Sequence, residues 1–97
     1  MITLLVLNIP PELEEDLVDY LLSQAAVSGF TSYETRGHGD DLIMSVAEQV
    51  SGRRKRMQFE ILLEQTQVQG LLDGLVDNVG RDITYWEQQV RNVGQIE

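Results

Sequence analysis

Residues 56–80, RMQFEILLEQTQVQGLLDGLVDNVG, decide the fold because they predict a strand followed directly by a helix. In the first half, apolar and polar residues alternate, which is typical of a strand with one buried face. From Thr66, which can cap a helix, apolar residues recur at helical spacing until Gly80 ends the pattern. We expect Gly70 and Gly74 on the opposite side of that helix. The residues expected to face the core are Met57, Phe59, Ile61, Leu63, Val68, Leu71, Leu72, Leu75, Val76 and Val79.

The rest of the chain supplies three strands and one helix. Residues 2–7 are almost uniformly apolar, which predicts a strand covered on both faces. A helix is expected over 11–24, with proline and acidic residues in its first turn. Strands rich in threonine and aromatic residues are expected over 27–36 and 83–93. The resulting order predicts an α+β, ferredoxin-like βαββαβ sandwich, in which two helices cover one face of an antiparallel sheet.

The composition excludes several classes of function. The chain has 97 residues and a mass of 11.0 kDa, which predicts a single domain over 1–97. With 16 acidic and 7 basic side chains, its net charge of −9 repels nucleic acid, so no nucleic-acid partner is expected. It has no cysteine and only one histidine, so we expect no enzyme activity. No segment approaches the ~20 apolar residues of a spanning helix, so the protein is expected to be cytoplasmic and not membrane-embedded.

The open face of the predicted sheet carries more apolar surface than a monomer should expose. The first strand is apolar on both sides, and Tyr33 and Trp86 add large aromatic rings near the same sheet. A domain of this size has no further element with which to cover that face. We therefore expect another subunit to bury it.

The connection between the second and third strands, residues 37–52, is much longer than the roughly two to five residues of a usual hairpin. Directly after it comes the run Arg53, Arg54, Lys55 and Arg56, which holds four of the seven basic residues. In one interpretation this run only keeps the entry to a strand soluble. In the other it binds an anion, because guanidinium groups match the geometry of phosphate and carboxylate. The position beside a glycine-bounded loop in an acidic chain favours anion binding.

His38 is a candidate metal ligand, with Asp40 or Asp41 as a further ligand, because imidazole and carboxylate together suit several divalent ions. Adjacent side chains in one loop rarely converge on one ion. An exposed loop histidine is therefore the simpler interpretation for a monomer. In a symmetric oligomer, three copies of His38 could meet at one ion.

Three segments together resemble a known family: SGFTS at 28–32, GHG at 37–39 and AEQVSGR at 47–53. The chain resembles the small, uncharacterised PII-like proteins associated with heavy-metal efflux systems of the resistance-nodulation-division type. More distantly it is similar to the nitrogen-regulatory PII proteins and to the CutA group. The resemblance implies a ferredoxin-like protomer, a homotrimer whose sheets pack around a threefold axis, and a T-loop-like insertion at about 37–52.

This resemblance implies a trimeric regulatory protein that binds a small anionic effector near the loop and modulates a transporter or an enzyme. The effector could be a nucleotide, and its expected ligands are Gly37, Gly39, Arg53, Arg54 and Arg56. The Gly-rich basic loop that follows the second helix in PII proteins has no match here, which leaves classical sensing of ATP and 2-oxoglutarate open. One alternative is a CutA-like metal-binding accessory protein of an efflux system, with a divalent ion held by His38, Asp40 and Asp41. Another is a structural adaptor that binds no ligand.

Overall fold

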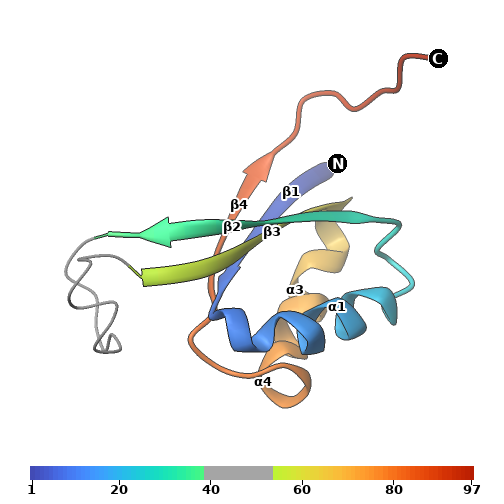
Figure 1. Ribbon diagram of the computed structural model, residues 1–97. Helices are drawn as coiled ribbons and strands as arrows, with labels where there is room; N and C mark the ends of the chain where they lie inside the picture. Colours follow the sequence, from blue (N-terminus) through green and yellow to red (C-terminus); the bar gives the residue numbers. More distant parts are fainter. Residues whose placement is uncertain (39–53) are drawn as a thin grey trace.

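The computed structural model describes residues 1–38 and 54–97. Its four strands form one antiparallel sheet in the order β2-β3-β1-β4, and the helices lie together on one face of it (Figure 1). This confirms the predicted ferredoxin-like α+β fold. In chain order the elements are β1 (Ile2–Ile9), the 3-10 helix η1 (Pro11–Leu13), α1 (Glu14–Leu22), β2 (Phe30–Gly37), β3 (Arg54–Glu64), α3 (Gln65–Asp73), α4 (Leu75–Asn78) and β4 (Thr84–Gln89).

The core lies between the sheet and the helices, and it confirms the alternating pattern of β3. Phe59 and Ile61 are fully buried, as are Leu5 and Leu7 on the neighbouring strand β1. Burial of each such side chain contributes about 1.5–3 kcal/mol to stability. The other core residues are Ile9, Leu17, Tyr20, Leu21, Met57, Leu63, Val68, Leu71, Leu75 and Val79.

The second predicted helix differs from expectation at its start. Helix α3 begins at Gln65, its N-cap is Glu64, and no side chain caps it. The predicted cap at Thr66 is therefore wrong. The chain passes directly from β3 into the helix, so the last residue of the strand takes the extended cap conformation and leaves Thr66 inside the first turn.

The same helix is divided at Gly74 into α3 and α4, because Tyr20 of α1 packs against this position. The Tyr20 hydroxyl donates a hydrogen bond to the carbonyl of Leu71 at 2.8 Å. A Cβ on Gly74 would overlap that hydroxyl, whereas a Cβ on Gly70 would meet nothing within 4 Å. Gly70 therefore lies on the open side as expected, but the placement of Gly74 there is wrong.

Two strands are shorter than predicted. The strand expected from residue 27 begins at Phe30, because Val27 instead donates its amide to the carbonyl of Gln24 in the turn after α1. The strand expected to reach residue 93 ends at Gln89, and the next amide, that of Val90, donates to Ile2 at 3.0 Å. Because Ile2 is the first residue of β1, no strand of residues 1–38 and 54–97 continues the pairing beyond this point.

The face of the sheet away from the helices is partly apolar. Val6 points to this face and is only 2% exposed, since it lies between Glu60 of β3 and Trp86 of β4 in the sheet register. Tyr33, Leu62 and Trp86 remain 40–42% exposed on the same face. None of the helices described above covers them (Figure 1). We call these four residues, Val6, Tyr33, Leu62 and Trp86, the open-face stripe.

Candidate functional site

Strands β2 and β3 extend beyond the rest of the sheet as a two-stranded ribbon (Figure 1). Pairing of β3 with β1 stops at Met57 opposite Ile9, whereas pairing of β3 with β2 continues to Arg54 opposite Gly37. Three residues of each strand therefore project past the edge of the core. This ribbon leads into residues 39–53, so its end is the part of the described structure that lies closest in sequence to the long connection.

The end of the ribbon is basic. Arg36 and Lys55 lie directly opposite one another in the register, and both are exposed. Two positive side chains at opposite positions of a ribbon together attract an anion. Along the sequence, five of the seven basic residues of this acidic chain fall within 36–56.

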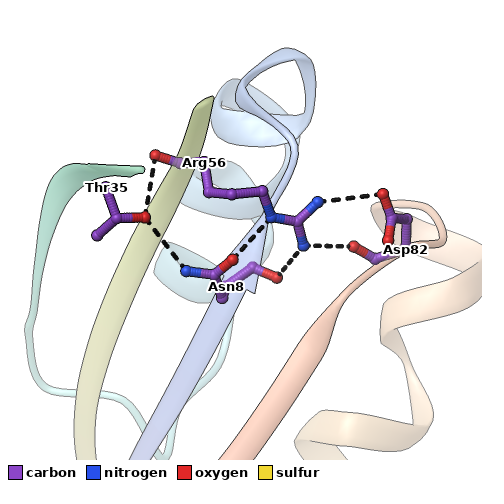
Figure 2. A network of polar contacts seen from close by, with 4 residues as sticks. All are labelled: Asn8, Thr35, Arg56 and Asp82. Carbon is purple, nitrogen blue, oxygen red and sulfur yellow. Dashed lines mark hydrogen bonds and ion pairs between the residues drawn. The ribbon is translucent and has the colours of Figure 1, made fainter. Parts of the chain in front are cut away.

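Arg56 lies at the base of the ribbon and is 5% exposed, because its guanidinium joins three parts of the fold (Figure 2). Its Nε donates to Asn8 Oδ1 at 2.7 Å, and its Nη2 donates to the Asn8 carbonyl at 2.7 Å. The same Nη2 donates to the Asp82 carbonyl at 2.8 Å, and Nη1 pairs with Asp82 Oδ2 at 3.1 Å. Thr35 of β2 donates to the Arg56 carbonyl at 3.4 Å and accepts from Asn8 Nδ2 at 3.3 Å.

This network connects the base of the ribbon to the loop before β4. The loop is held in an unusual backbone shape, since Asp82 has a φ of 65° and Gly80 a φ of 152°. At Gly80 a Cβ would also come within 3.1 Å of the Leu13 side chain, so this position requires glycine. Asp82 provides one partner of a nearly buried cation, and removing a partner from such a pair is costly. The network therefore has a clear structural role.

A second polar group lies on the open face. The Tyr33 hydroxyl donates to Glu60 Oε2 at 2.6 Å and accepts from Gln58 Nε2 at 2.8 Å. The hydrogen bond to Glu60 raises the pKa of Tyr33 above its usual value of 10.0. These two hydrogen bonds hold the Tyr33 hydroxyl in place, and the ring of Tyr33 belongs to the open-face stripe.

The structure places only some of the predicted site residues. Gly37 ends β2, His38 is exposed after it, and the backbone of Arg54 pairs with Gly37. Arg56 turns inward to Asn8 and Asp82 rather than outward to the ribbon end. The remaining predicted ligands, Gly39, Asp40, Asp41 and Arg53, lie outside the described residues.

No group of three or more histidine, cysteine or acidic side chains that could hold a metal ion occurs within 1–38 and 54–97. The proposed set of His38, Asp40 and Asp41 falls partly outside those ranges, so it stays a prediction. Asn8 and Asp82 were missed by the sequence reasoning. Asn8 did leave a signal, since it is a lone amide that interrupts the apolar run of the first strand.

A family model described as "Protein of unknown function (DUF3240)" matches residues 1–97. The chain belongs to the DUF3240 family. It is similar to the crystal structure, at 2.40 Å resolution, of a DUF3240 family protein from Shewanella baltica OS155, with a TM-score of 0.81. The two are 25% identical, and the match covers 99% of this chain and 97% of the other. No curated protein matches the chain.

The match to DUF3240 supports one part of the resemblance described in the sequence analysis. An uncharacterised family was expected and is found, but the family description gives no function, so the PII-like and metal-efflux expectations remain predictions. In the part of this DUF3240 chain that the structure describes, no helix is both long enough and apolar enough to span a bilayer.

Proposed function

We propose that this DUF3240 protein is a cytoplasmic, PII-like regulatory protein that acts as a homotrimer. It binds a small anionic effector, such as a nucleotide, at the end of the β2–β3 ribbon and modulates a partner protein such as a transporter. The ferredoxin-like fold and the position of the long connection between β2 and β3 are both compatible with this proposal.

The observation that carries the proposal is the basic end of the ribbon. Arg36 and Lys55 are paired across two strands that lead into residues 39–53, in a chain whose net charge is −9. Exposed charges contribute little to the free energy of folding. Basic side chains at the end of the ribbon are therefore better explained by binding than by stability. Gly37 leaves the backbone near the effector uncovered by a side chain. In this proposal, Arg56 positions the ribbon and does not contact the effector.

The open-face stripe supports the trimer. Leu62 and Trp86 are exposed apolar side chains on a sheet face that no described helix covers, and Val6 lies between their strands. Packing this stripe against the sheets of two other copies removes it from water, and each Å² of apolar surface buried contributes about 25 cal/mol. A closed threefold arrangement uses the same surface on every copy and leaves none exposed.

Calorimetric titration with ATP, ADP, AMP and cyclic dinucleotides tests the effector site. Arg36→Ala and Arg91→Ala form a matched pair, because each removes one exposed positive charge and only Arg36 lies at the ribbon end. We expect at least one of these nucleotides to bind, and Arg36→Ala to weaken its affinity about tenfold or more. Arg91→Ala should bind as the wild type does. Absence of binding by every nucleotide, or equal weakening in the two variants, contradicts the proposed site.

A further inference from the structure

The chain continues past β4 as a segment with exposed apolar side chains. The last backbone contact to the sheet is the hydrogen bond from the Val90 amide to Ile2. Residues 91–97, called the tail below, then extend away from the body (Figure 1). Val93 is 52% exposed and Ile96 is 100% exposed. Neither side chain is buried within its own copy, so both are available to contact another surface.

An apolar groove lies at the opposite end of β4. Its volume is about 260 Å³, and it is formed between helices α3 and α4, the loop that follows them and the beginning of β4. Val76 and Tyr85 are 51% and 52% exposed at this groove, and Arg81 adds a positive charge. The remaining lining residues are Leu72, Leu75, Gly80, Asp82 and Ile83.

Within one copy, the shortest return of the tail carries Ile96 no further than the Tyr85 end of the groove. The tail leaves where β4 ends, and Val90 is held to Ile2, so the shortest return is a turn at residues 91–92. That turn would bring Ile96 back only as far as Glu87. Two residues remain to Tyr85 and four to Ile83, which are distances of about 7 Å and about 13 Å along an extended strand.

We propose that the tail of one copy docks in the groove of a second copy of this chain. Ile96 and Val93 then enter the apolar lining at Val76 and Tyr85. The carboxylate of Glu97, which follows Ile96, then faces Arg81, since the Asp82 carboxylate in the same lining is already paired with Arg56. Because the donated segment and the receiving groove are different surfaces, repetition of this contact generates a ring where the rotation between copies closes and an open filament where it does not. The inference goes beyond the proposed function and does not use the open-face stripe.

Cross-linking tests the docking directly. Because the chain contains no cysteine, every thiol cross-link forms between the two cysteines that are introduced. Chains carrying Ile96→Cys are mixed with chains carrying Val76→Cys and treated with a short bis-maleimide. Leu22→Cys, on an exposed part of α1 at 71% exposure, replaces Val76→Cys as the matched control. Docking raises the local thiol concentration, so we expect about tenfold more linked pairs with Val76→Cys than with Leu22→Cys. Equal yields overturn the proposal.

A chain carrying both Val76→Cys and Ile96→Cys separates docking between copies from docking within one copy. Docking between copies links successive chains into dimers and larger species under denaturing electrophoresis. Exclusive formation of an internally bridged monomer overturns the proposal. The mass of the protein in solution tests the trimer of the proposed function separately from tail docking. A trimer without Val76–Ile96 links contradicts tail docking alone, whereas links within a ring of another size support docking and contradict the trimer.

Discussion

Replacing Arg56 with methionine separates a structural role for its guanidinium from a role in effector binding. The side chain is almost buried and donates to Asn8 on β1 and to Asp82 in the loop before β4 (Figure 2). Methionine keeps an unbranched apolar stem of similar length but has no donor. The substitution therefore removes the polar connection between β1, β3 and that loop while it preserves most of the packing of the stem.

We expect the free energy of unfolding of Arg56→Met to fall by about 3 kcal/mol. Hydrogen bonds to a charged group contribute about 1.5–3 kcal/mol each, and breaking a buried ion pair costs about 3–5 kcal/mol. The lower part of that range applies because the side chain of Asp82 is 53% exposed and regains water when its partner is lost. Arg56→Lys keeps the charge but not the planar fork, so it should recover only part of the loss.

Urea denaturation at one protein concentration measures this difference, since the apparent stability of an oligomer depends on concentration. Arg91→Met is the control, because Arg91 is exposed and its replacement should change the free energy of unfolding by less than about 0.5 kcal/mol. If Arg56→Met loses no more stability than Arg91→Met, the structural role is refuted. Weakened nucleotide binding in the same stable variant would then return Arg56 to the effector site.

Three further predictions concern other parts of the molecule. Gly74→Ala should lower the free energy of unfolding by about 1–3 kcal/mol because its Cβ overlaps Tyr20, whereas Gly70→Ala should raise it by about 0.5–1 kcal/mol; urea denaturation compares the two, and the same sign for both contradicts the close approach. Burial raises the pKa of Tyr20 above 10.0, so stability from its protonated hydroxyl is present below pH 10 and falls as pH rises through the folded-state pKa; melting temperatures across this range should show a loss that is smaller in Tyr20→Phe, in which only Tyr33 keeps a raised pKa. If His38 binds a metal, titration with Cu²⁺, Zn²⁺ and Ni²⁺ should give weaker binding to His38→Ala than to the wild type, and equal binding removes the site.

The parts of the fold that depend on local periodicity could be predicted from the sequence. The two-residue period of β3 identified Phe59 and Ile61 as core residues because the side chains of a strand alternate between its faces whatever lies around them. The position of Gly74 could not be predicted in the same way. Its neighbour Tyr20 is distant in sequence. The spacing of apolar residues in one helix does not predict how closely a second helix packs against it.

The candidate site shows the same limit. The run 53–56 indicates a positive charge, but which of its side chains point to solvent cannot be predicted from the sequence. Arg56 has the same strand face as Gln58, and only the register with β1 brings it beside Asn8. Its second partner, Asp82, lies in another loop whose backbone conformation depends on the packing of Gly80 against Leu13. The lone amide of Asn8 in an apolar run marks one partner in the sequence, but the pairing itself follows from tertiary structure.

The mass of the wild-type protein in solution tests the central claim most directly, because PII-like regulation as proposed here requires a trimer formed through the open-face stripe. Light scattering at micromolar concentration should give three times the chain mass of 11.0 kDa. Trp86→Glu, which places a charge at the β4 end of that stripe, should reduce the mass toward that of one chain while the fold is retained. A wild-type mass of 11.0 kDa, or a trimer unaffected by Trp86→Glu, contradicts the account.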